Sequence, residues 1–294
     1  MTLHVVHRTD YVYESVVSSS YGQIYMLPRV SPGQRVARCR VVIDPLPDSY
    51  NEFTDYFGNH VANFSVSTDH TQLVITTTTD VDVSSRTEPT SSELTPRPWH
   101  EAVAATAQSN DPVDIEAREF SFPSPLVPLS DRVREYATSS FTPGRDLLDV
   151  VRELTQRIHS DVTYTSGVTS LTTMPDDVLE LRKGVCQDYA HLEIACLRSF
   201  GVAARYVSGY LETVAPPGKT KLRGADASHA WISVYFPGYG WVDVDPTNDC
   251  FVVDRHICTA WGRDYQDVSP IKGVIFTDAK SNVMTVSVDV SHVS

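Results

Sequence analysis

The chain has 294 residues, of which 41% are hydrophobic and 21% charged, a composition typical of a globular protein long enough for two domains. Its formal net charge of -13 would repel phosphate groups, which argues against nucleic acid or an anionic membrane as a partner. The first residues lack the basic start and apolar run of a signal peptide, and no stretch approaches the roughly 18 apolar residues of a membrane span. We therefore expect a cytoplasmic protein that does not associate with membranes.

Residues 2–83 alternate apolar and polar side chains over short runs that are rich in Val, Ile, Thr and Tyr. This period of two predicts antiparallel strands, and turn sequences such as Ser31-Pro32-Gly33 separate them. We predict an N-terminal β-sandwich domain over residues 1–85. Residues 86–98 are rich in Ser, Thr and Pro with almost no large apolar residue, and they predict an exposed linker.

Residues 99–294 are predicted to form a second domain with a helical half and a sheet half. A helix is expected where apolar residues follow i, i+3, i+4 spacing, at Leu147, Val150, Val151, Leu154 and Ile158. A further helix is expected from Cys186 to a glycine cap at Gly201. The segments that follow alternate like strands, so the predicted fold class is α+β.

Three motifs bring together the groups that acyl transfer through a cysteine requires. GVCQDYAHLEIACL supplies a thiol at Cys186, SHAWISVYF an imidazole at His229, and GWVDVDPTN a carboxylate. A cysteine in the first turn of a helix lies beside unpaired N–H groups and the positive end of the helix dipole, which favours a thiolate nucleophile. The N–H of Cys186 could also hold an oxyanion. Cys196, which lies in the middle of the same helix, is assigned to the core.

The predicted strand pattern restricts which acid can reach the imidazole. Alternation puts His229 and Trp231 on one face, and Asp243 and Asp245 share a face of the next strand, so parity alone does not choose between the two carboxylates. His229 and Asp245 face the same side only if the loop between the strands has an odd length or a bulge intervenes.

The cysteines also bear on two structural alternatives. Zinc accepts thiolate, imidazole and carboxylate ligands, so Cys186, His229 and Asp245 could in principle form a metal site. The absence of paired cysteines and of an HExxH motif favours a nucleophile and no metal. The five cysteines likewise do not suggest a disulfide framework, and we expect reduced thiols. They are Cys39, Cys186, Cys196, Cys250 and Cys258.

At these motifs the chain resembles the transglutaminase-like superfamily, in particular bacterial members described as cysteine proteases, over nearly its full length. The family's Gly-x-Cys, His-Ala-Trp and Asp-Pro-Thr motifs match at Cys186, His229 and Asp245, and this match selects Asp245 over Asp243. HRTDYVYE, LPRVSPGQRV and DYFGN resemble the β-domain that precedes the core in bacterial members. The resemblance implies a papain-like core of helices packed on an antiparallel sheet, a Cys-His-Asp triad, and acyl chemistry on amides without a cofactor.

Further residues near the motifs are candidates for substrate binding. They are Gln187, Asp188, Asp226, Trp231, Arg263, Asp264 and Tyr265. For the loop that carries the last three of these, a solvated loop held by a local salt bridge is the competing interpretation.

The leading functional hypothesis is hydrolysis of a peptide or isopeptide bond through a thioester. The alternatives are amine crosslinking by a true transglutaminase and a non-catalytic peptide-binding module on the same fold. We expect a peptide or protein substrate, and the sequence leaves the acyl acceptor, homo-oligomerisation and the role of the β-domain open.

Overall fold

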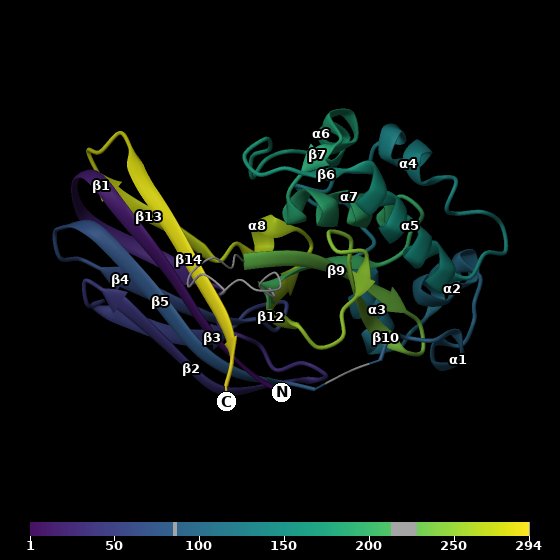
Figure 1. The fold of residues 1–294 in the computed structure, drawn as a ribbon, viewed down its shortest axis with the longest axis horizontal. Coiled ribbons are helices and arrows are strands. Elements are labelled where there is room, and N and C mark those ends of the chain that lie inside the picture. The colour runs from purple at the N-terminus through teal and green to yellow at the C-terminus, as the bar shows by residue number, and fades with distance from the viewer. Residues whose placement is uncertain (85–86, 213–227, 294) are drawn as a thin grey trace, which may run out of the picture.

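The computed structural model describes residues 1–84, 87–212 and 228–293, which form a curled β-sheet and a mixed helical and β core (Figure 1). The curled sheet has seven antiparallel strands in the order β2-β5-β1-β4-β3, with β13 and β14 also paired to β1. Its strands are β1 (Thr2–Ile24), β2 (Gln34–Asp44), β3 (Ser49–Thr54), β4 (His60–Val66), β5 (His70–Val83), β13 (Ile271–Thr277) and β14 (Asn282–His292).

The long strand β1 organises this sheet. Its first half pairs with β5 and β14, and its second half pairs with β4 and β13, with an irregularity between Val12 and Val17. The two C-terminal strands therefore complete the N-terminal sheet. The prediction instead assigns all of residues 99–294 to the core. Alternating polarity identifies a strand but carries no information about a partner more than 200 residues away.

The segment predicted as an exposed linker has structure of its own. It contains the short helix α1 (Ser91–Leu94), and Leu94 is buried in the main core of the second unit. One large apolar side chain in an otherwise polar segment is enough to attach it to the core, because burying a leucine contributes about 1.5–3 kcal/mol.

The second unit packs helices on a five-stranded antiparallel sheet, which confirms the predicted α+β class (Figure 1). The sheet order is β11-β10-β9-β8-β12, and a parallel pair β6-β7 lies apart from it. Its strands are β6 (Thr163–Tyr164), β7 (Lys183–Gly184), β8 (Ala204–Leu211), β9 (Ser228–Phe236), β10 (Gly240–Asp245), β11 (Cys250–Phe251) and β12 (His256–Gly262). Its helices are α2 (Trp99–Gln108), α3 (Pro112–Glu119), α4 (Asp131–Ala137), α5 (Leu147–Asp161), α6 (Pro175–Leu181), α7 (Cys186–Arg198) and α8 (Tyr265–Val268).

Helix α7 forms the centre of this unit. Every residue from Gln187 to Arg198 is buried, and the helix packs against β8 and β9. Gly201 follows the helix with a φ of 81°, a left-handed conformation that suits glycine after a helix C-terminus. Within the described residues, no helix combines the length and apolar character needed to span a bilayer.

Two side-chain amides, one from strand β2 and one from the loop between β3 and β4, bind the outer edge of β12. The amide of Gln34 bonds to both the N–H and the C=O of Cys258, each at 2.8 Å. The amide of Asn59 bonds to the N–H and C=O of Trp261 at 2.9 and 2.8 Å. These bonds satisfy backbone groups that an edge strand otherwise leaves open, and they fix the two units against each other.

Candidate active site

Cys186 is the first residue of α7 and is partly buried. The turn before it is held by Asp188, whose Oδ2 accepts the N–H of Val185 at 2.7 Å and the hydroxyl of Thr169 at 2.7 Å. A Cβ at Gly184 would lie 2.7 Å from the Asp188 Cβ, so this close packing requires a glycine. The N–H of Cys186 lies in the first turn, where no intrahelical carbonyl can accept it, and it can donate to a substrate oxygen.

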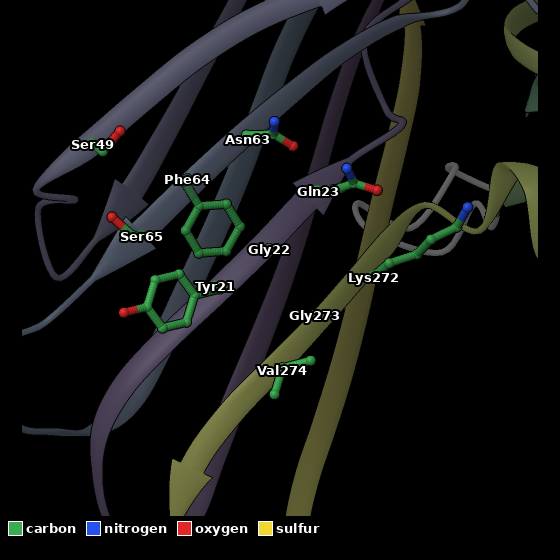
Figure 2. A pocket seen from close by; sticks show the side chains of 10 residues that line it. All are labelled: Tyr21, Gly22, Gln23, Ser49, Asn63, Phe64, Ser65, Lys272, Gly273 and Val274. Atoms are coloured by element: carbon green, nitrogen blue, oxygen red, sulfur yellow. The ribbon is translucent and has the colours of Figure 1, made fainter. Parts of the chain in front are cut away.

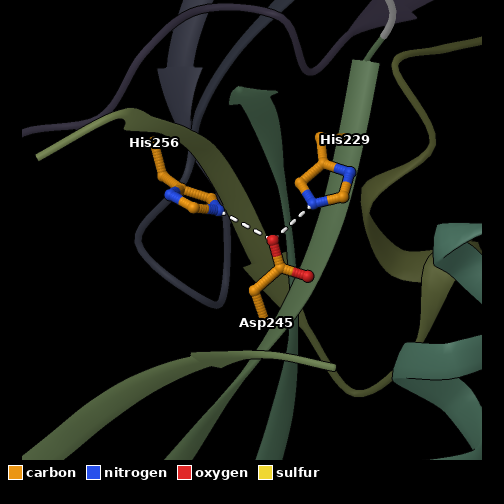
Figure 3. Close-up of side chains that lie close together, drawn as sticks. All are labelled: His229, Asp245 and His256. Atoms are coloured by element: carbon orange, nitrogen blue, oxygen red, sulfur yellow. Dashed lines mark hydrogen bonds and ion pairs between the residues drawn. The ribbon is translucent and has the colours of Figure 1, made fainter. Parts of the chain in front are cut away.

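His229 and Asp245 meet where two neighbouring strands carry them to one face. In the β9-β10 hairpin Phe236 pairs with Gly240, so the loop has three residues and meets the requirement for an odd length. His229 Nε2 lies 2.7 Å from Asp245 Oδ2 (Figure 3). Asp243 pairs with Ser233 further along the hairpin.

The carboxylate of Asp245 is fully buried and receives several hydrogen bonds. Its Oδ1 accepts the backbone N–H groups of Thr247 at 3.0 Å and Asn248 at 3.2 Å, and its Oδ2 accepts the Asn248 side-chain amide at 2.7 Å. Burial alone would raise the pKa of Asp245, but hydrogen bonds from His229 and His256 outweigh it and hold the pKa well below its usual range. Asp245 is therefore ionised at every pH at which the protein would work.

The imidazole of His229 is held in its protonated form by its neighbours. Burial alone would lower its pKa, but hydrogen bonds to Asp245 and Cys186, together with their negative charges, raise the pKa to about 10. Because Nε2 is bound to Asp245, Nδ1 is the ring nitrogen left to exchange a proton with the thiol, and it points away from the carboxylate (Figure 3).

His256, at the start of β12, is a member of this cluster that the sequence analysis missed. Its Nε2 lies 2.9 Å from Asp245 Oδ2, and its side chain is 5% exposed (Figure 3). Since the carboxylate oxygen can only accept, Nε2 carries the proton. The sequence does contain a feature that could have pointed to it. The segment HICTAWG has a histidine at the start of an alternating strand, as the segment SHAWISVYF has.

The structure gives the predicted substrate-binding residues different surroundings. Trp231 is 1% exposed and packs beside the rings of His229 and His256, with centroids 6.2 and 5.0 Å away. Gln187 is buried and donates to the carbonyl of Leu171 at 3.1 Å.

The remaining candidates lie around α8. Arg263 forms a bidentate pair with Asp267, as the competing salt-bridge interpretation expected. Asp264 is fully buried and caps α8 through the N–H of Gln266. Tyr265 is partly exposed and packs on the same core cluster as Cys186. Asp226 lies outside the described residues.

His229, Asp245 and His256 are also a group that could hold a metal, since one donor atom of each lies within 4.8 Å of the others. Cys186 does not belong to this group. In the structure both Nε2 atoms face the same carboxylate oxygen at hydrogen-bond distance. Coordination would require both nitrogens to lose their protons and turn a lone pair to the ion. The present arrangement suits a network that holds protons.

A cavity of about 670 Å³ lies elsewhere, on the curled sheet (Figure 2). Its lining comes from β1, β3, β4 and β13, and Gly22 and Gly273 form its floor with Phe64 beside them. Among its lining residues only Lys272 carries a charge, and its Nζ donates to the carbonyl of Asp267. Among the described residues that line this cavity, no nucleophile is paired with a base.

Comparison with known proteins identifies the family of the chain. A family profile of the transglutaminase-like superfamily matches residues 134–246, and one of the bacterial transglutaminase-like N-terminal region matches residues 3–82. A solved structure described as a candidate cysteine protease of Cytophaga hutchinsonii superposes with a TM-score of 0.76 at 22% identity, covering 100% of this chain and 92% of that one. It shares the fold.

Two mycobacterial relatives extend over nearly the whole chain. An uncharacterized protein of Mycobacterium tuberculosis is 44% identical over 97% of this chain and 91% of its own length, and one of Mycobacterium leprae is 35% identical over 92% of each. A protein-glutamine gamma-glutamyltransferase of Pseudomonas aeruginosa is 34% identical over 33% of this chain and 15% of its own. The chain therefore belongs to the transglutaminase-like superfamily and carries the bacterial N-terminal region of that family.

Proposed function

We propose that this protein is a cysteine-dependent acyl-transfer enzyme that acts on amide bonds and hydrolyses them through a thioester. The observation that carries the proposal is the 2.7 Å contact between His229 Nε2 and the buried Asp245, in a site where Cys186 and Asp245 together raise the pKa of His229 to about 10. An imidazolium next to a thiol at a helix N-terminus is the arrangement of an activated cysteine.

In the acylation step the Cys186 thiolate attacks the carbonyl carbon of the amide, and the carbonyl oxygen takes the electron pair. The N–H of Cys186 can donate to this oxygen, and such a donor is typically worth about 10²–10³ in rate. When the carbon–nitrogen bond breaks, the proton on His229 Nδ1 passes to the leaving nitrogen. An amine departs and a thioester remains on Cys186.

In the second step water attacks the thioester while neutral His229 takes its proton. The carbon–sulfur bond breaks, a carboxylic acid leaves, and the thiolate and imidazolium are restored. A primary amine in place of water would give a crosslink. The similarity to the protein-glutamine gamma-glutamyltransferase favours this as the second candidate.

The nucleophile is tested first by limiting iodoacetamide at pH 6.5 with the modified cysteine located by peptide mapping. Burial raises the pKa of Cys39 and of Cys250 to about 11 and that of Cys196 still higher, so these three thiols should stay protonated and react slowly. Cys186 should be labelled selectively, and a His229→Gln variant should lose this selectivity. Equal labelling of all five cysteines would reject an activated nucleophile.

The reaction is tested by incubating the full chain with glutamine-containing peptides, with and without a labelled primary amine, and following products by mass. The products distinguish three outcomes. Peptide hydrolysis cleaves a peptide bond, hydrolysis of the glutamine side chain releases ammonia, and crosslinking adds the labelled amine. A Cys186→Ala variant should remove all of them, because triad members act as a unit. Peptide binding without any product, unchanged in that variant, would instead support a binding module.

A further inference from the structure

A cavity of about 290 Å³ lies between the curled sheet and the catalytic core. One wall comes from β1 and β14 of the sheet, and the other includes Ser228 and Tyr265 of the core. Cavities for drug-sized ligands measure roughly 300–1,000 Å³, so this one lies at the lower end of that range and has room for a side chain of a peptide.

Two lining residues connect the cavity to the proposed catalytic residues. Ser228 directly precedes His229 in β9. Tyr265 packs on the same core cluster as Cys186, and its pKa is raised by burial and by the nearby charge of Cys186. In Figure 1 the start of β9 and α8 lie on the side of the core that faces β14. The core wall of the cavity therefore includes residues that neighbour His229 in the chain and Cys186 in the core.

The described residues that line the cavity carry no net charge, although the chain has 37 acidic residues. Lysine, arginine, aspartate and glutamate are all absent from the described residues that line it. Burial lowers the pKa of His7 to about 4 and raises that of Tyr11 to about 12, so both are neutral at pH 7. A charged side chain would lose its hydration here without gaining a counter-ion from these described residues.

The sheet also exposes apolar side chains into this cavity. Alternate residues of β14 face the core, and of these Val288 and Val290 are buried against it at 0 and 1% exposure. The same row continues with Val286 and Met284, which are 44 and 57% exposed and line the cavity. A row of apolar side chains that runs from a packed interface to an exposed position beside a catalytic group is typical of a ligand-binding surface.

We propose that this cavity binds an uncharged apolar side chain of the peptide substrate next to the amide that Cys186 attacks, so that the curled sheet sets substrate preference. The inference rests on the proposed function, because it places a substrate on the same nucleophile. It gives the N-terminal unit and the returning strand β14 a direct part in specificity.

The test compares alkylation of Cys186 by four probes that share one reactive group. Iodoacetamide is the reference, and iodoacetyl-leucinamide, iodoacetyl-aspartamide and iodoacetyl-lysinamide add an apolar, an acidic or a basic side chain. In the wild-type chain the leucine probe should react at least about tenfold faster than the charged probes, since apolar groups in such pockets discriminate by roughly 10–200-fold. A Met284→Glu variant should abolish this preference and leave the iodoacetamide rate unchanged.

Val283→Glu is the matched control, because Val283 is 64% exposed and alternates to the opposite face of β14. It should keep the wild-type preference. Equal rates for the three side-chain probes, or a preference that survives Met284→Glu, would overturn the subsite while selective iodoacetamide labelling still supported the nucleophile. Failure of iodoacetamide itself to label Cys186 selectively would overturn both proposals.

Discussion

Asp245 Oδ2 accepts hydrogen bonds from two imidazoles, that of His229 at 2.7 Å and that of His256 at 2.9 Å. The acid predicted as the third member of a triad is thus the centre of a His-Asp-His cluster (Figure 3). His256 reaches it from β12, although β9 and β8 lie between β12 and β10 in the sheet. Between them, Gly209 of β8 is closely packed, since a Cβ there would lie 2.7 Å from the Trp231 ring and 1.9 Å from the Ile257 carbonyl.

We expect His256 to act as a positioning residue. In a His256→Leu variant Asp245 loses one donor that lowers its pKa, so the acid limb of Cys186 alkylation should move to higher pH. A hydrogen bond to a charged group is worth about 1.5–3 kcal/mol, which predicts a loss of roughly tenfold or more in rate. The measurement is the iodoacetamide rate from pH 4 to 10.

His256→Gln provides the control for this variant, because its amide can still donate to Asp245. It should restore most of the rate and the position of the acid limb. If the leucine variant lowered thermal stability but kept the wild-type pH profile, His256 would be a packing residue.

The protonation of His229 gives a second prediction. Its pKa of about 10 depends on Asp245, because burial acting alone would lower it. In ¹⁵N NMR the His229 ring should titrate near pH 10 in the wild-type chain and at a clearly lower pH in Asp245→Asn, with a His229→Gln spectrum to assign the signal. A wild-type midpoint near the ordinary value of about 6.5 would contradict the ion pair.

The elements that carry Cys186, His229 and Asp245 follow from local pattern. An uninterrupted helical run after Gly184 predicts α7, and alternation on both sides of a Pro-Gly turn predicts the β9-β10 hairpin. The elements are local features, so the sequence is sufficient to predict them. Which face the side chains share depends on the loop length or on a bulge, and the pairing of Phe236 with Gly240 in the structure decides it.

Strand order has no comparable local signal. The place of His256 beside Asp245 depends on β12 joining the far edge of the sheet, and the cavity wall depends on β14 pairing with β1. Both pairings join distant segments and are selected by tertiary packing. The same reason explains why residues 271–292 could be predicted as strands while their place in the curled sheet could not.

The contact between the two units should weaken in acid because of His7. Burial lowers its pKa to about 4, and its ring bonds to the hydroxyl of Tyr210 at 2.9 Å across the interface. A histidine whose pKa is lowered in the folded state contributes to the free energy of unfolding above pH 6.5. This contribution, up to roughly 3 kcal/mol, is lost as the pH falls toward 4.

A His7→Phe variant should therefore show a smaller drop in unfolding free energy between pH 7 and pH 4.5 than the wild-type chain, measured by urea denaturation. The control is His4→Gln, since His4 lies on the same strand, faces the other way and is partly exposed. It should keep the wild-type pH dependence. An identical drop in His7→Phe would show that the buried imidazole accepts a proton without cost.

Glu193, which is buried on α7 two turns after Cys186, should limit stability at alkaline pH. Burial raises its pKa to about 8, and one of its oxygens accepts the Thr155 hydroxyl at 2.7 Å while the other has no partner among the described residues. With a raised folded pKa, the neutral acid is favoured in the folded state, and stability is lost as pH rises from about 4.5 through 8. Glu193→Gln should match the wild-type unfolding free energy at pH 5 and exceed it by at least about 1 kcal/mol at pH 8.5.

The control is Glu180→Gln, because Glu180 forms an exposed ion pair with Arg132. This variant should change the unfolding free energy by no more than about 0.5 kcal/mol at either pH. A Glu193→Gln variant that is less stable than wild type at pH 8.5 would mean that the ionised carboxylate has a stabilising partner.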